Sequence, residues 1–123
     1  MIGDEISLTL PRERPYYRIA ELVLGGLAAR HEVTLEHLED LELALEGLLE
    51  RLDGDGPAVV RLRVEDGALR AAVGPYDERL RGDLEREAEN AIGLRRLLDA
   101  VVDRYEVVDA DGGHWIELTK AVR

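Results

Sequence analysis

Three glutamates at four-residue steps come nearest to a catalytic arrangement in this sequence. Glu42, Glu46 and Glu50 fall on one face of a predicted helix, because four residues make about one helical turn. Carboxylates placed in this way can serve acid–base or metal chemistry. A solvated, charged helix surface has the same spacing, so the residues alone leave both interpretations open.

The remaining residue types exclude several other chemistries. The 123 residues include no cysteine, which excludes disulfides, thiolate zinc sites and a cysteine nucleophile. Ser7 is the only serine and lies in a predicted strand near the start of the chain, which argues against a serine nucleophile. No two of the histidines stand at metal-ligand spacing, so we expect all three to be structural: His31, His37 and His114.

The charge balance restricts the partners. The chain has 16 Lys and Arg against 27 Asp and Glu, a formal net charge of −11. Such an excess repels phosphate backbones, so we expect no nucleic acid partner and favour basic protein surfaces. No apolar stretch reaches the ~20 residues of a membrane span, and the first residues are acidic, unlike a signal peptide. We therefore expect a soluble cytoplasmic protein with no membrane contact.

Hydrophobic periodicity and turn residues predict nine elements in the order β-α-α-β-β-α-α-β-β. Thr34 is a good N-cap, and Asp66-Gly67 between apolar alternations is a strong hairpin signal. We expect Gly74-Pro75 to end the third strand. The predicted strands are 5–10, 58–64, 68–73, 105–108 and 114–119, and the predicted helices are 14–30, 35–53, 77–88 and 94–104.

This order predicts one α+β domain over residues 1–123. Consecutive hairpins, with no regular strand–helix–strand alternation, are typical of a two-layer sandwich in which helices cover one face of a mostly antiparallel sheet. In the first helix, three- and four-residue steps predict a buried stripe of Ile19, Leu22, Val23 and Leu27. Gly25-Gly26 predicts close packing of that helix against a neighbouring element, because each glycine costs ~1 kcal/mol of helix propensity.

Four segments taken in order resemble the anti-sigma factor serine/threonine kinases, a branch of the histidine-kinase-like ATPase (GHKL) superfamily. The resemblance spans nearly the whole chain and implies the histidine-kinase-like ATPase fold. Each segment alone is weakly specific, and the order and spacing carry the comparison. The segments are 6–11 (ISLTLP), 38–46 (LEDLELALE), 93–103 (GLRRLLDAVVD) and 115–120 (WIELTK).

The resemblance implies an altered metal and catalytic site. In that family the second helix carries a Glu that activates the attacking hydroxyl and, four residues later, an Asn that holds Mg²⁺. The alignment puts Gly47 in the place of the Glu and Arg51 in the place of the Asn. A shift by one residue recovers Glu46 and Glu50 as an acidic pair. No shift recovers the amide, because the only asparagine is Asn90.

Two further elements of the family's nucleotide site also depart from the pattern. An Asp-x-Gly motif that reads adenine should follow the middle strand, but the chain has no acidic residue there before Asp77. The glycine-rich lid should follow, but the only glycine between Pro75 and Ile92 is Gly82. The vestigial nucleotide-binding positions that the resemblance implies are Gly47, Arg51, Gly74, Asp77 and Gly93.

The sequence therefore predicts a non-catalytic regulatory domain without a cofactor. As in the family it resembles, we expect it to form a homodimer and to bind a protein partner such as a sigma factor or an antagonist. The alternative is an active serine/threonine protein kinase that uses ATP with Mg²⁺ and has Glu46 or Glu50 as its catalytic residue. A scaffold or dimerisation domain outside signalling is a third interpretation.

Overall fold

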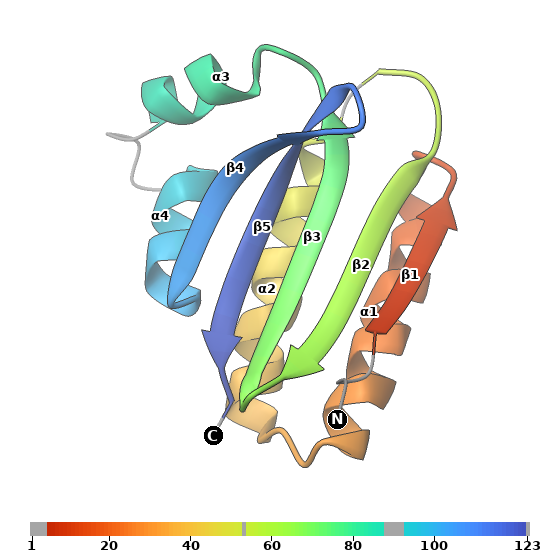
Figure 1. Cartoon of the computed structure of the whole chain (residues 1–123), viewed down its shortest axis with the longest axis vertical. Helices are drawn as coiled ribbons and strands as arrows, with labels where there is room; N and C mark the ends of the chain where they lie inside the picture. The colour runs from red at the N-terminus through yellow and green to blue at the C-terminus, as the bar shows by residue number, and fades with distance from the viewer. Residues whose placement is uncertain (1–4, 53, 88–92, 123) are drawn as a thin grey trace.

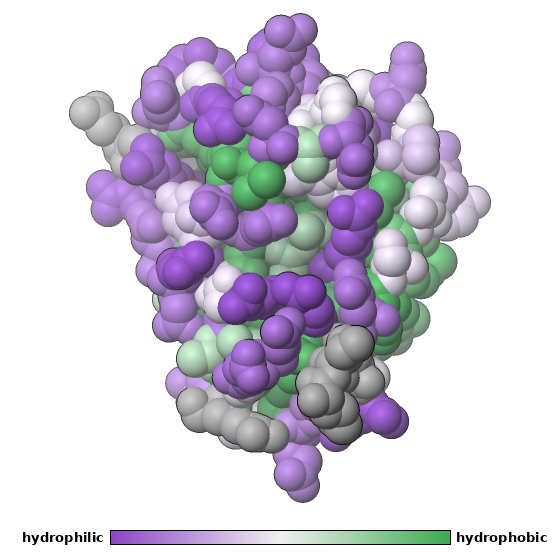
Figure 2. All heavy atoms as spheres, in the orientation of Figure 1, coloured by the Kyte–Doolittle hydropathy of each residue, from purple (hydrophilic) through white to green (hydrophobic). Residues whose placement is uncertain are grey.

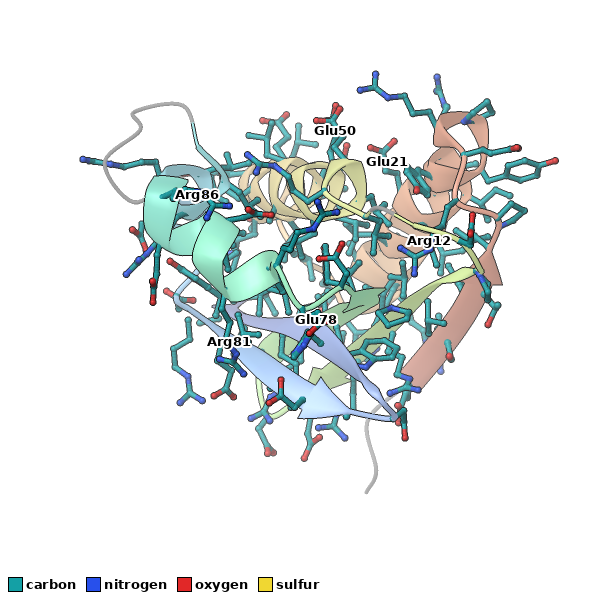
Figure 3. The ribbon with its side chains drawn as sticks, turned by 90° about the horizontal axis from the view of Figure 1, so that it is seen from above. Arg12, Glu21, Glu50, Glu78, Arg81 and Arg86 are labelled. Atoms are coloured by element: carbon teal, nitrogen blue, oxygen red, sulfur yellow. The ribbon has the colours of Figure 1, made fainter. Side chains whose placement is uncertain are left out.

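The computed structural model describes residues 5–52, 54–87 and 93–122. Within them, a five-stranded sheet has the order β1-β2-β3-β5-β4, and all neighbouring strands are antiparallel. The helices all lie on one side of this sheet (Figures 1 and 3). The predicted two-layer α+β architecture is confirmed. The elements are β1 (Glu5–Leu10), α1 (Arg14–Arg30), α2 (Leu35–Glu50), β2 (Ala58–Glu65), β3 (Ala68–Tyr76), α3 (Leu80–Glu87), α4 (Leu94–Val101), β4 (Arg104–Ala110) and β5 (Gly113–Ala121).

Local signals place the chain reversals where the sequence predicts them. The amide of His37 donates to the Thr34 hydroxyl at 3.2 Å, which caps α2. At the β2–β3 turn both Asp66 and Gly67 have positive φ, at 52° and 75°. That pair of values is typical of the two-residue turns whose twist matches a hairpin. Asp111 and Gly112 make the same kind of turn between β4 and β5.

The core lies between the sheet and the helices, with α2 behind β3 and β5 (Figure 1). The inward side chains of β2 are Val60, Leu62 and Val64, as the alternation predicts, and they meet a row of buried leucines on α2. One charged side chain enters this layer. The ammonium of Lys120 donates to the carbonyl of Val101 at 2.8 Å and lies 3.3 Å from a carboxylate oxygen of Asp40. A buried charge is tolerated when it is paired in this way.

The buried stripe predicted for α1 is wrong. Ile19 is 41% exposed and Leu22 is 75% exposed, although Val23 and Leu27 do contact the core. The residues that α1 buries are Ala20, Leu24, Leu27 and Ala28. Two of the four are alanines, which a search for large apolar side chains overlooks. As a result, α1 turns two large apolar side chains toward solvent.

The close packing predicted for Gly25-Gly26 is also wrong. A Cβ built on either glycine would meet nothing within 4 Å among the described residues. The glycine pair therefore leaves an open surface on α1 beside strand β1. A hollow there is lined by Ile6, Val23 and Gly26, among others.

Several element ends differ from the predictions. Helix α4 ends at Val101, not at residue 104, because the Asp103 carboxylate accepts the amide of Ala121 at 2.6 Å and holds that segment to β5. Strand β3 continues through the cis Gly74–Pro75 bond to Tyr76, with a register shift after Val73. Helix α3 begins at Leu80 instead of residue 77, and its predicted end at residue 88 lies outside the described residues.

Strands β4 and β5 are longer than predicted, so their turn shrinks from residues 109–113 to Asp111 and Gly112. The predicted end of the second helix at residue 53 lies outside the described residues, and α2 ends at Glu50. None of the described helices combines the length and the apolar character that crossing a membrane requires.

Candidate functional site

The end of α2, the end of β3 and the two short helices surround the candidate site. The resemblance places the vestigial nucleotide positions here, and the structure brings Arg51 and Asp77 onto the wall of one cavity. That cavity has a volume of only about 70 Å³ and is also lined by Tyr76, Leu80 and Leu94. Two of the five predicted positions therefore share a cavity, and that cavity encloses little space.

Helix α4 closes the site against α2. A Cβ on Gly47 would stand 2.9 Å from Cδ2 of Leu97 and 3.1 Å from Cδ1 of Leu94. Carbon atoms in proteins seldom approach more closely than van der Waals contact, so any larger side chain here must displace a leucine. Where the resemblance expects a glutamate, the chain has the glycine that lets α4 lie directly on α2.

Tyr76 closes the same site from the sheet side. Its side chain is 4% exposed, and its hydroxyl donates to the carbonyl of Leu48 at 2.5 Å. Burial raises the pKa of the Tyr76 phenol far above its usual range, so the hydroxyl keeps its proton and remains a donor. The neighbouring Pro75 carbonyl accepts from Nη2 of Arg12 at 2.7 Å. The Tyr76 contact fixes the end of β3 to the last turn of α2, and the Arg12 contact ties it to the segment between β1 and α1.

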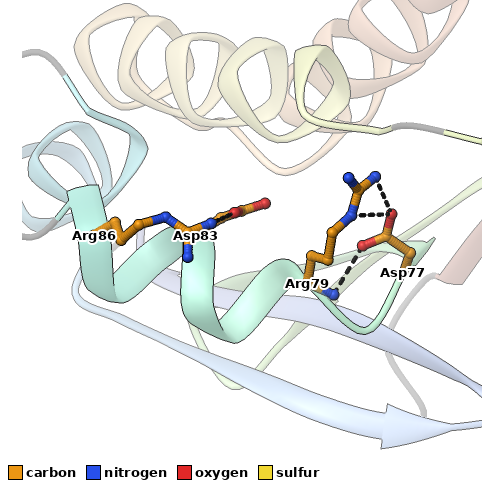
Figure 4. Close-up of polar contacts among 4 residues, drawn as sticks. All are labelled: Asp77, Arg79, Asp83 and Arg86. Carbon is orange, nitrogen blue, oxygen red and sulfur yellow. Dashed lines mark hydrogen bonds and ion pairs between the residues drawn. The ribbon is translucent and has the colours of Figure 1, made fainter.

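The carboxylate of Asp77 accepts hydrogen bonds from Arg79, two residues further along the same turn (Figure 4). One oxygen accepts the backbone amide of Arg79 at 2.9 Å, and the other accepts Nη2 of the same arginine at 2.9 Å. The side-chain hydrogen bond from Arg79, followed by the backbone one, lowers the pKa of Asp77. On the next turn, Asp83 pairs with Arg86. Both acids are thus occupied by neighbouring arginines.

The two remaining vestigial positions are glycines, one at a close approach of β3 to a ring and the other at the start of a helix. A Cβ on Gly74 would stand 2.7 Å from the indole ring of Trp115, so only glycine lets β3 pass this ring. Gly93 is buried and is the N-cap residue of α4. Asn90, the one amide that the Mg²⁺ comparison involves, lies outside the described residues.

The glutamates of the predicted ladder are not brought into this cavity. Glu46 and Glu50 are exposed on α2, and Glu50 lies 3.9 Å from Arg14 of α1. On the neighbouring helix α1, Glu21 points toward the same side as Glu50 (Figure 3). Partial burial, followed by the charges of Glu46 and Glu42, raises the pKa of Glu21. The ladder is therefore part of an acidic surface that spans α1 and α2.

The described residues around the cavity do not fit Mg²⁺ with a nucleoside triphosphate. Magnesium prefers oxygen ligands, and the two carboxylates in the cavity lining, those of Asp77 and Asp83, are paired with Arg79 and Arg86. The resemblance puts Arg51 in the place of the metal-binding amide. The volume of about 70 Å³ is also well below the ~300–1,000 Å³ of typical small-molecule sites. In the described part of the chain, no group of three or more His, Asp or Glu side chains is arranged to hold a metal ion.

Sequence reasoning missed Tyr76 as the residue that closes the site. We expected Gly74-Pro75 to end the strand, and that placed Tyr76 in a loop. The strand continues through this dipeptide with its buried positions shifted by one residue, since Val73 and Tyr76, three positions apart, are both buried. An aromatic residue directly after an apolar strand was the available signal.

Comparison with known proteins finds similar molecules. No family model matches the chain. The serine-protein kinase RsbW of Bacillus pumilus is 27% identical over 140 aligned positions, which cover 95% of this chain and 85% of that protein. The resemblance to the anti-sigma factor kinases is confirmed. It rests on nearly the full length of the chain, as the order of the four sequence segments predicted.

A solved structure shows the same fold. The crystal structure of the RsbU and RsbW domains of Rv1364c from Mycobacterium tuberculosis superposes with a TM-score of 0.70 at 17% identity, over 97% of this chain. This chain spans about a third of the length of that protein chain, 32%. The histidine-kinase-like ATPase fold expected from the anti-sigma factor kinases is confirmed.

The contact between Gly47 and α4 generates a prediction. Gly47→Glu places a Cβ in contact with Leu97, and overpacking of this kind costs about 1–3 kcal/mol. Removing a glycine from a helix returns only about 0.5–1 kcal/mol. We expect the free energy of unfolding, measured in urea, to fall.

In a Leu97→Ala background the same substitution loses the closer of its two tight contacts and keeps the one with Leu94, so we expect it to destabilise the fold less. The exposed Glu46→Gln serves as the control and should change stability by less than about 0.5 kcal/mol. Equal effects of Gly47→Glu in both backgrounds would show that α4 does not restrict this position.

Proposed function

We propose that this chain is a non-catalytic, cytoplasmic regulatory module of the anti-sigma type. It binds a sigma factor or an antagonist protein and uses no Mg·ATP. The observation that carries the proposal is the packing of Leu94 and Leu97 on Gly47, the position that the resemblance assigns to the catalytic glutamate. The presence of Arg51 beside the cavity and the small volume of that cavity also argue against binding of Mg·ATP. The alternative is an active kinase with Glu46 or Glu50 as its base, as the name of the Bacillus relative suggests.

A calorimetric titration with Mg·ATP separates the two functions. We expect no heat of binding up to millimolar nucleotide, because the triphosphate finds neither a metal ligand nor sufficient space. Binding in the micromolar range would contradict the proposal. In that case, phosphorylation of an antagonist by Glu46→Gln and Glu50→Gln variants would identify the base of the active kinase.

The acidic surface of α1 and α2 is the proposed contact for the partner. Its charged members are Glu21, Glu42 and Glu46, and the raised pKa of Glu21 reflects their mutual repulsion as well as burial. Leu35 and Leu43 are 69% and 49% exposed on the same helix, α2. Acidic groups beside exposed apolar side chains suit a basic, amphipathic segment of a partner.

A charge reversal tests this surface. In a pull-down against the sigma factors of the source organism, we expect Glu46→Lys to weaken capture, because it repels a basic segment. Glu78→Lys changes the net charge equally but is exposed between β3 and α3, outside α1 and α2. It should leave capture unchanged. If both variants bind as well as the native chain, or lose capture equally, the acidic surface is not the contact.

We further propose that the chain forms a homodimer through α1 and the free edge of β1. Ile19, Leu22 and Gly26 stand three and four residues apart on one face of α1, next to the hollow lined by Ile6 and Val23. The open surface at Gly25-Gly26 leaves room for a second helix. The edge of β1 offers unpaired backbone groups to a second strand.

Sedimentation measurements test the dimer. We expect the native chain to sediment as a dimer and Leu22→Glu to sediment as a monomer, since it places a charge in the apolar contact. Leu43→Glu is the matched control, because Leu43 is also exposed but lies on α2. A dimer that survives Leu22→Glu would contradict this interface.

A further inference from the structure

The open face of the sheet carries a line of arginines. In the strand register, Arg63 of β2 lies opposite Arg70 of β3. On the other side of β3, Arg70 lies opposite Thr119 of β5, and Thr119 in turn lies opposite Arg104 of β4. Their chain neighbours Val64, Leu69 and Leu118 face the core, so these side chains face away from the helices. Figure 2 shows this face, with strongly hydrophilic side chains over the lower half of the strands.

The row of arginines across the sheet does not stabilise the fold. Like charges directly opposite one another on neighbouring strands are destabilising. Arg63 has a counter-charge, because its Nε lies 3.1 Å from the carboxylate of Glu65 and it faces Glu5 across the β1–β2 pair. Within residues 5–52, 54–87 and 93–122, neither Arg70 nor Arg104 has an ion pair within 4.0 Å. In a chain with 27 acidic residues, counter-charges are abundant.

The two unpaired arginines border a hollow on the sheet. Its volume is about 240 Å³, and it is lined by four arginines against three glutamates, which are Glu5, Glu106 and Glu117. Glu106 and Glu117 face each other in the row beside Thr119. Arg70 and Arg104 are two strands apart, which is about 10 Å, with the Thr119 hydroxyl between them. This arrangement offers two cationic groups and a hydroxyl to an anionic ligand.

We propose that Arg70, Thr119 and Arg104 bind a short acidic peptide segment of a protein partner. Side chains two residues apart in an extended peptide point the same way, about 6.6–6.8 Å from each other. Two such carboxylates can each reach one arginine, because arginine side chains are long and their guanidinium groups match carboxylate geometry. The site lies on the layer opposite the helices, so it does not rest on the proposed function.

The segment must be short because of the charge around the hollow. Beyond the arginines it meets Glu106 and Glu117, and the chain as a whole carries a net charge of −11. A long polyanion such as a nucleic acid would extend onto this repulsive surface. A few adjacent carboxylates gain the contact with Arg70 and Arg104 and avoid most of the repulsion.

The chain carries its own reporter for this site. Trp115 is the only tryptophan and lies in β5, with the guanidinium carbon of Arg61 4.8 Å from its ring centroid. Arg61 also lines the hollow. A ligand that attracts Arg61 changes the cation–π contact and therefore the environment of the indole. Intrinsic fluorescence can follow binding without a label.

The test is a fluorescence titration of the full chain with hexaglutamate. We expect a saturable change in Trp115 emission that weakens as salt is added. Arg70→Gln and Arg104→Gln should each weaken binding about fivefold, as expected for exposed ion pairs. Arg18→Gln removes the same charge from the exposed surface of α1 and should leave binding unchanged. Both sheet variants should melt no lower than the native chain, since they relieve unpaired charge.

Four outcomes would overturn the proposal. The first is no response to hexaglutamate, and the second is an equal response to hexalysine. The third is a loss of binding in Arg18→Gln as large as in the sheet variants, which would indicate net charge and not a site. The fourth is a response to inorganic phosphate without one to hexaglutamate, which would identify a small-anion site.

Discussion

The contact between α4 and α2 governs the candidate site. At Gly47, near the end of α2, two leucines of α4 approach the helix closely, and Leu94 and Leu97 fill the space that a side chain would take. Tyr76 then joins the end of β3 to Leu48 on the same turn. Because both contacts are made by core side chains, the site cannot widen without loss of packing. The stability of the fold and the small volume of the cavity have the same cause.

The sequence predicts those features of the fold that depend on local chemistry. Thr34 as a cap, Asp66-Gly67 as a turn and the alternation of β2 are each encoded by neighbouring residues, and all three are confirmed. The errors arise where tertiary contacts decide. The buried face of α1 is set by two alanines that fit against its neighbours, and α4 ends where Asp103 binds β5. Neither contact leaves a periodic pattern in the sequence.

For the candidate site, the sequence identified the altered positions but not what replaced them. Gly47 and Arg51 could be named from the resemblance alone. The filling of the site could not, because it needs the distance from α2 to Leu97 and the continuation of β3 past Pro75 to Tyr76. A residue assigned by the resemblance is visible in one segment, whereas a closed cavity is a property of three segments distant in the chain.

The two layers of the molecule differ in charge in a way that composition conceals. The chain as a whole has a net charge of −11, and in the helical layer the charges of Glu46 and Glu42 repel that of Glu21. On the sheet, Arg70 and Arg104 become neighbours of Thr119 only through the pairing of β3 and β4 with β5. They are 34 positions apart in the sequence, so no window of the chain contains both. A local excess of positive charge can therefore exist in an acidic chain, and strand register is what creates it.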